Sequence, residues 1–560
     1  MLPAASLALD PSTPSSSSTE TPVSEQTLTP SETEDALVLE DGVPHYVSGK
    51  HWVWMAEDSD IKSLLNEMQT ASSEPADQML FEPAVSPASA FLPATREDCY
   101  LLLNLFLANV DPMVRIIHRP SLTRRFDVFV GCHYSTSPAP AASAGTPFDA
   151  LAMAVFLAAI NSIKEADVVS VFSTSKAQLM HRYQAGTEFH LSQHHFLTTR
   201  SFEVLQALVI FITAKCREDE MGEVYSLTGL AIRIAMLQGL HRDPLALRHG
   251  VAVDSVAVEL RRRLWAQICH LDYRAAESHG LVPSIRDSDF DTRLPLNIDD
   301  GDLQPAPGVL LVDCPRFTDM TMYLIRITGI ASFRRVVQIT RDGTNGTTAQ
   351  PPTLNHYRQL VVKAEQLARD LDASLSRLLP LCDERISIQA MAVHYSRRLT
   401  CKFWVMFWIQ IPRQYRDHIM TAETRQRIFS DAVLTIENWC MAASATEAQG
   451  FHWQIHSHAG FFPILYVLSE LRSPGFQAPD LDALRARGLQ AVTSIAHMRQ
   501  TSSGPWPSIT RLVERVSQNT SLAVEHNPLP LPDLAMDDPF AGQLDGFDFF
   551  DFAAADLAFH

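Results

Sequence analysis

The sequence predicts an all-α protein: a large helical bundle with disordered N- and C-terminal tails. Apolar residues recur at helical spacing in segment after segment of the 560-residue chain. No segment shows a convincing strand-like alternation of apolar and polar residues, which favours a bundle over a sheet. With 46% hydrophobic and 19% charged residues, the chain can bury a large core, and its length suggests two or more domains.

The first ninety residues divide into a leader and a linker. Residues 1–40 are rich in Ser, Thr, Pro and Glu and lack Lys and Arg, so we expect a disordered leader, a passive solvated segment in preference to a phosphorylated one. Residues 41–90 form a linker with a short amphipathic helix, whose apolar face would be Ile61, Leu64, Leu65 and Met68.

Residues 91–340 are predicted to be a helical domain. Tyr100, Leu103, Leu107 and Val110 form one helical face, and residues 148–163 are so uniformly apolar that they should lie at the centre of the bundle. Between residues 201 and 300 we predict three helices. The first starts behind a Ser201 cap, the second stops at Gly239, and the third runs from about Val256 to Ser278.

These stretches resemble a known family. The succession LQALVIF, YSLTGLAIRIAMLQGLHRD, ELRRRLWAQICHLDY and GLVPSIRDSDFDTRLPLNIDD is similar to the middle homology region of fungal-specific transcription factors. That region is the helical regulatory domain that usually follows a binuclear zinc cluster. Residues 109–122 resemble its entry motif, in which Asp111-Pro112 starts a turn and His118-Arg119-Pro120 ends it. Residues 42–68 resemble the segment that follows the linker after the DNA-binding module.

The DNA-binding module itself is expected to be missing. A binuclear cluster needs six thiolates in two Cys-x-x-Cys half sites, whereas the eight cysteines here are scattered singly and the first is Cys99. A formal net charge of −19 also argues against a chain that binds nucleic acid without a partner. Without a signal peptide or a membrane-spanning stretch, we expect a soluble intracellular protein.

Residues 354–515 are predicted to be a second helical part, set off by a flexible break at residues 341–353. Its first helix carries Leu360, Ala364, Leu367, Leu371, Leu375 and Leu378 and ends at Pro380. The aromatic run at residues 403–411 is interpreted as core in preference to a small-molecule pocket. Further helices are expected over residues 428–439 and 484–498.

Several polar motifs are assigned structural roles. The clusters His190, His194, His195 and His452, His456, His458 lack a third carboxylate or thiolate nearby in sequence, so no metal site is expected. His118 and Arg119 are interpreted as capping a buried helix terminus. The aspartates Asp287, Asp289, Asp291, Asp299 and Asp300 are taken as solvated turn formers, because the calcium-loop pattern fails at Thr292 and Ile298. The basic run Arg261, Arg262 and Arg263 is interpreted as a solvated helix start or a partner-facing patch.

Residues 516–560 form an acidic, aromatic tail. Seven aspartates between residues 532 and 560 interleave with phenylalanines. Carboxylate repulsion keeps the rings from collapsing together, which leaves them available to enter a hydrophobic groove on a partner. We therefore predict a coactivator-binding activation segment in which the contact residues are Phe540, Phe547, Phe549, Phe550, Phe552 and Phe559. The alternative is a solvated tail whose aromatics dock on the protein's own bundle.

The hypothesis is a nuclear transcription regulator, without catalytic residues, cofactor or metal, that acts through a helical regulatory or dimerisation body and the acidic tail. The family resemblance implies a pathway-specific role in a secondary-metabolite gene cluster, a homo- or heterodimer, coactivator partners, a small-molecule effector, and DNA contact only through a partner or the missing cluster. Two alternatives stay open: a non-DNA-binding partner that represses a full-length factor, and a helical small-molecule-binding protein or enzyme unrelated to transcription. The familiar enzyme motifs are absent from the sequence.

Overall fold

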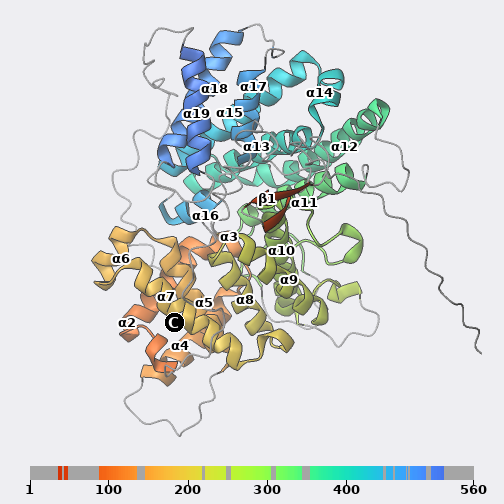
Figure 1. Ribbon diagram of the computed structural model, residues 1–560. Helices are drawn as coiled ribbons and strands as arrows, with labels where there is room; N and C mark the ends of the chain where they lie inside the picture. The colour runs from red at the N-terminus through yellow and green to blue at the C-terminus, as the bar shows by residue number, and fades with distance from the viewer. Residues whose placement is uncertain are drawn as a thin grey trace, which may run out of the picture.

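The computed structural model describes residues 36–40, 43–47, 88–134, 146–216, 221–246, 254–303, 311–342, 353–444, 449–457, 461–473, 476, 480–499 and 506–521. These residues confirm the all-α class. Their helices pack around two large hydrophobic cores. Figure 1 shows the N-terminal helices in the lower half of the molecule and the C-terminal helices in the upper half. Helices α10 (Ser255–Ser278) and α11 (Thr321–Asp342) lie where the halves meet.

The first core is organised around α5 (Pro147–Ser162), whose side chains are buried almost without exception. This confirms the central helix predicted from its uniform apolarity. It packs most extensively against α7 (Lys176–Gln193) and α8 (Phe202–Ala214). The other helices around this core are α2 (Arg96–Leu105), α3 (Asp111–Val114), α4 (Arg119–Tyr134) and α6 (Glu165–Phe172).

The next helices begin and end where the sequence predicts. The Ser201 side chain accepts the backbone N–H of Val204 (3.4 Å), which caps α8. Helix α9 (Met221–Leu237) ends before Gly239, whose φ of +71° lies in the left-handed region. Helix α10 (Ser255–Ser278) matches the third predicted helix within one residue at its start. Local apolar spacing and cap residues are therefore sufficient to locate these helices.

The second core contains α11 (Thr321–Asp342) and the helices after it. Most of the aromatic run at residues 403–411 lies at the end of α13 (Ser387–Ile409), and Phe403, Phe407 and Trp408 are buried in this core, as predicted. The other helices of this half are α12 (Leu354–Leu378), α13 (Ser387–Ile409), α14 (Arg413–Ile419), α15 (Ala422–Ser444), α16 (His452–Ser457), α17 (Phe461–Arg472), α18 (Leu481–Met498) and α19 (Trp506–Ser521).

The two halves are joined by more than the connection from α10 to α11. Trp453 of α16 packs against both cores and donates its indole N–H to the carbonyl of Asn109 (3.1 Å). Gly450 approaches the same asparagine so closely that an added Cβ would lie 2.5 Å from Oδ1 of Asn109. The C-terminal half thus returns to the entry motif of the N-terminal half.

Strands β1 (Ala36–Glu40) and β2 (Val43–Val47) form an antiparallel hairpin, in which Ala36 pairs with Val47 and Glu40 with Val43. The sequence analysis does not predict this hairpin, whose two strands lie on either side of the boundary predicted at residue 40. The intervening Asp-Gly pair is typical of two-residue hairpin loops. The predicted linker helix around residues 61–68 lies outside the described residues. None of the described helices is long and apolar enough to cross a membrane.

Candidate functional site

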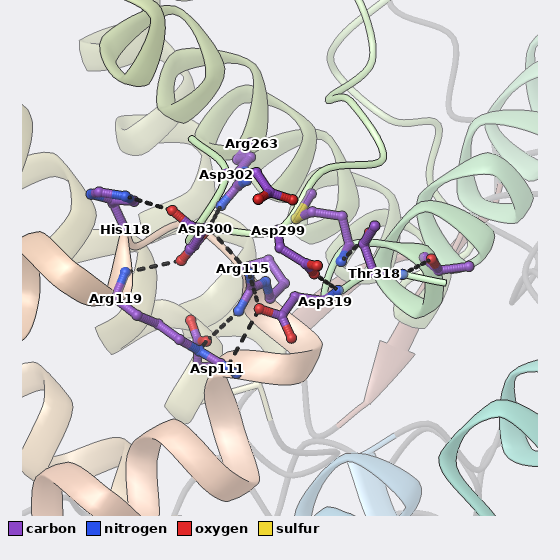
Figure 2. Close-up of polar contacts among 12 residues, drawn as sticks. Asp111, Arg115, His118, Arg119, Arg263, Asp299, Asp300, Asp302, Thr318 and Asp319 are labelled. Atoms are coloured by element: carbon purple, nitrogen blue, oxygen red, sulfur yellow. Dashed lines mark hydrogen bonds and ion pairs between the residues drawn. The ribbon is translucent and has the colours of Figure 1, made fainter. Parts of the chain in front are cut away.

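The stretches that carry the family resemblance meet at one buried ionic cluster, which we call the Asp300 hub. It consists of Asp111 and Arg115 from α3 and its end, Arg119 at the start of α4, Arg263 of α10, and Asp300 of the segment after α10. Figure 2 shows these side chains converging on one another from segments that are far apart in the sequence.

Arg115 holds the entry motif in an unusual backbone conformation. Its φ of 49° and ψ of 31° are left-handed, a region that non-glycine residues rarely adopt. The side chain is fully buried, with Nη1 2.7 Å from Oδ2 of Asp111 and Nη2 3.2 Å from Oδ1 of Asp300. These two carboxylates fix the guanidinium and thereby stabilise the turn between α3 and α4.

Asp300 connects that turn to α10. Its Oδ2 accepts the backbone N–H of Arg119 (2.9 Å), and its Oδ1 accepts from Nη1 of Arg263 (2.6 Å). Its carbonyl oxygen lies 3.2 Å from Nε2 of His118. The predicted role of His118 and Arg119 at a helix terminus fits this geometry, because α4 begins at Arg119 and both residues bind the segment that crosses its start.

The charges of the hub compensate one another. Burial acts to raise the pKa of Asp300, but Arg115 and Arg263 outweigh it and hold that pKa below its usual value. Burial likewise acts to lower the pKa of Arg263, and Asp300 and Glu259 reverse the effect. Glu259 also accepts the backbone N–H of Leu296 from the segment after α10 (3.1 Å). Arg263 and Asp300 therefore stabilise each other's charged form inside the protein.

Two sequence-based interpretations are wrong here. Arg262 and Arg263 are not solvated: their side chains are 5% and 0% exposed, and Arg262 forms a two-pronged ion pair with Asp243 at 2.9 and 3.1 Å. Asp300 is likewise buried and is not a solvated turn former. Arg262 and Asp243 are 19 residues apart and Arg263 and Asp300 are 37 apart, so local sequence spacing does not reveal these two pairs.

The other polar motifs show no catalytic or metal-binding arrangement in the part of the chain that the structure describes. His190 and His194 lie on α7, and burial lowers the pKa of His190 to about 4. His133 Nε2 lies 3.5 Å from Oδ1 of Asp149. No group of three His, Cys, Asp or Glu side chains among the described residues is placed to hold a metal ion.

The six phenylalanines that we predicted to bind a coactivator, Phe540 to Phe559, lie outside the described residues, so their role stays a prediction. The hub residues are the ones that sequence reasoning missed. One signal for them was available, since an Arg triplet and a closely spaced run of aspartates both fall within the motifs of the resemblance.

Comparison with known proteins gives the family. Residues 103–327, which contain every member of the hub, match the fungal specific transcription factor domain. Over 522 residues the chain is 37% identical to the C6 finger domain transcription factor hasF of Aspergillus fumigatus, covering 87% of this chain and 68% of hasF.

Two further relatives share shorter regions. The aurofusarin cluster transcription factor aurR2 of Gibberella zeae is 26% identical over 366 residues, covering 65% of this chain and 51% of aurR2. The C6 finger domain transcription factor adaR of Aspergillus niger is 34% identical over 301 residues, covering 52% of this chain and 37% of adaR. The chain spans about two thirds of hasF and about half or less of the other two. The expected resemblance is thus confirmed, and the chain belongs to the family of fungal-specific transcription factors.

Proposed function

We propose that this protein is a nuclear, pathway-specific regulator of transcription for a secondary-metabolite gene cluster. The observation that carries the proposal is the similarity to hasF through 87% of the chain, together with the matched domain at residues 103–327. The name of aurR2, an aurofusarin cluster transcription factor, supports a secondary-metabolite cluster as the class of target genes. The relatives are named as transcription factors, so we propose a role without catalysis.

The charge distribution supports action through protein contacts. Residues 1–87 carry 15 acidic and 2 basic side chains, and residues 522–560 carry 8 acidic and none basic. The intervening 88–521 carry 43 basic and 41 acidic side chains and are close to neutral. Neither the acidic ends nor the neutral body offers the concentrated positive charge that phosphate binding needs, so DNA contact would come from a partner or a zinc cluster.

The body and the tail would have separate tasks. The helical body would serve as the regulatory platform that dimerises or binds a small-molecule effector. The tail would recruit coactivator through Phe540, Phe547, Phe549, Phe550, Phe552 and Phe559, with the aspartates keeping the segment extended in water. An aromatic side chain offers the large apolar area on which such helix-in-groove contacts depend.

A reporter experiment tests this division. The full chain is fused to a foreign DNA-binding domain, and reporter output is measured for the parent and for a variant with Phe547, Phe549 and Phe550 replaced by Ala. We expect the triple variant to lose about fivefold or more of the output, as buried aromatic anchors do in other interfaces. The matched control replaces Leu529 and Leu531, apolar tail residues before the acidic stretch, and should retain it. Equal output from all three fusions would contradict the activation segment.

The acidic ends and the near-neutral body also suit a second candidate, a partner that represses a DNA-binding factor by pairing with it. The same fusions separate the two. A repressing partner gives no activation when tethered, and its expression lowers the output of a full-length relative.

A further inference from the structure

Helices α10, α11 and α13 carry three cationic side chains that all lie close enough to His270 to act on it electrostatically. We call Arg274, Arg326 and Lys402 the cation cluster. His270 lies among them. Its burial, and then the nearby charges of Arg326, Arg274 and Lys402, hold the pKa of His270 well below its usual value, so this histidine is neutral and adds no further charge.

One carboxylate serves two of these cations. Glu277 forms ion pairs with Arg274 and with Nζ of Lys402, the latter at 2.8 Å, and it also accepts the hydroxyl of Tyr273 at 2.8 Å. Burial acts to raise the pKa of Glu277, but Lys402 and Arg274 outweigh it and lower that pKa to about 2. Glu277 is therefore ionised, and it binds Arg274 and Tyr273 of its own helix and Lys402 of α13.

Arg326 has no such partner among the described residues. Its side chain is 2% exposed, and it donates from Nη2 to the carbonyl of Met113 and to Oε1 of Gln267 (2.9 Å), both neutral acceptors. Within the described part of the chain, its Nε has no hydrogen-bond partner and no carboxylate lies within ion-pair distance. The buried arginines of the hub, by contrast, each face a carboxylate.

A buried charge without a counter-ion destabilises the folded state. Moving a guanidinium out of water is strongly unfavourable unless an opposite charge and hydrogen bonds replace its hydration. Neutral carbonyl and amide oxygens satisfy part of the hydrogen-bonding need of Arg326 but do not neutralise it. An oxyanion next to Nε would do both, and the neighbouring cations Lys402 and Arg274 would add to the attraction.

We propose that the cation cluster binds the carboxylate or phosphate group of a small anionic molecule, with Arg326 as the principal contact. The site would draw on α10 and α11 and on α13 of the second core, and Arg326 also bonds Met113 at the end of α3. A bound anion would thus tie the entry motif to the C-terminal half. Its meaning as an effector site depends on the proposed regulatory function, whereas the binding itself does not.

The test is anion binding by the purified full chain. Thermal unfolding and calorimetric titration are carried out at constant ionic strength with sodium succinate, sodium phosphate and sodium chloride. We expect succinate or phosphate to raise the melting temperature saturably, and chloride to do so weakly or not at all. A response to succinate alone assigns a carboxylate, and one to phosphate alone assigns a phosphate.

Arg326→Gln should weaken the binding at least tenfold, as should Lys402→Gln, which serves if the first variant does not fold. The matched control is Arg335→Gln, because Arg335 lies on the same helix but is exposed and pairs with Asp287. It should leave binding unchanged. A saturable response equal in the parent, Arg326→Gln and Lys402→Gln would place the anion elsewhere and overturn the proposal.

An internal counter-ion is the rival explanation. Glu218, Asp219 and Glu220 follow Cys216 in the sequence and lie outside the described residues. If they neutralise the cluster, the parent shows no saturable anion response, and a Glu218→Gln, Asp219→Asn, Glu220→Gln variant acquires one that it loses again on Arg326→Gln. That result would overturn a ligand site in the native chain. It would leave the reporter test of the proposed function unaffected.

Discussion

Arg263 donates from Nη1 to Oδ1 of Asp300 at 2.6 Å, and the two side chains are 0% and 3% exposed. The contact ties the first turns of α10 to the segment that follows the helix. Because Asp300 also accepts the backbone N–H of Arg119, the same carboxylate fixes the start of α4. One acidic residue thus sets the relative position of three stretches that are shared with the family.

Replacement of Asp300 by Asn should lower the free energy of unfolding by about 3 kcal/mol, because two buried guanidiniums, Arg115 and Arg263, would lose their shared counter-ion. Urea denaturation of the two proteins measures the difference. Asp302→Asn is the matched control: Asp302 lies two residues further along, is half exposed and pairs with Arg316 at the surface, so a change within about 0.5 kcal/mol is expected. Similar losses in both variants would show that the hub carries no special stability.

Separate replacements of Arg261 and Arg262 by Ala test which arginines of the basic run are buried. Arg262→Ala should destabilise the protein by about 3 kcal/mol, because Asp243 would stay buried without its ion pair. Arg261 is only half buried and donates to the carbonyl of Gln238 at 2.8 Å, so Arg261→Ala should cost about 1 kcal/mol. Thermal unfolding gives both values, and a larger loss for Arg261→Ala would contradict the structure.

Acid should weaken the protein partly through Glu277. The pKa of this residue is lowered from 4.5 in a free side chain to about 2 in the fold, so its stabilising contribution is complete above about pH 4.5 and is lost as the pH falls toward 2. We therefore expect Glu277→Gln to destabilise the protein most at neutral pH and progressively less in acid. The measurement is urea denaturation of both proteins from pH 7 downward. A difference in unfolding free energy that does not vary with pH would be inconsistent with this assignment.

Two helical glycines should respond oppositely to Ala. An added Cβ at Gly488 of α18 would lie 2.6 Å from Cζ of the buried Phe429, so Gly488→Ala should destabilise the protein by about 1–3 kcal/mol through overpacking. At Gly229 of α9 nothing lies within 4 Å, and Gly229→Ala should stabilise the helix by up to about 1 kcal/mol. Thermal unfolding distinguishes the signs, and a stabilised Gly488→Ala protein would show that the contact between α15 and α18 is looser than described.

The alternative of a helical protein unrelated to transcription is removed by the family match, which the sequence motifs had already indicated. Coactivator binding by the tail remains a prediction, since its six phenylalanines lie outside the described residues. The divide between the halves also differs in detail from expectation. Helix α11 lies almost entirely before the predicted break at residues 341–353, yet Phe333 and Val336 on it belong to the second core.

The sequence by itself determined the fold class and the position of its main helices. The cap at Ser201, the stop at Gly239, the central α5 and the buried aromatic run of α13 all follow from local spacing, because residues three and four apart share a helical face wherever they occur. Only the tertiary structure decided which charges are buried. Arg263 and Asp300 are 37 residues apart, and Arg326 and Met113 are 213 apart. Whether a buried charge is paired depends on which distant segment packs against it. Helical periodicity describes neighbours three and four residues apart and contains no information about contacts between distant segments.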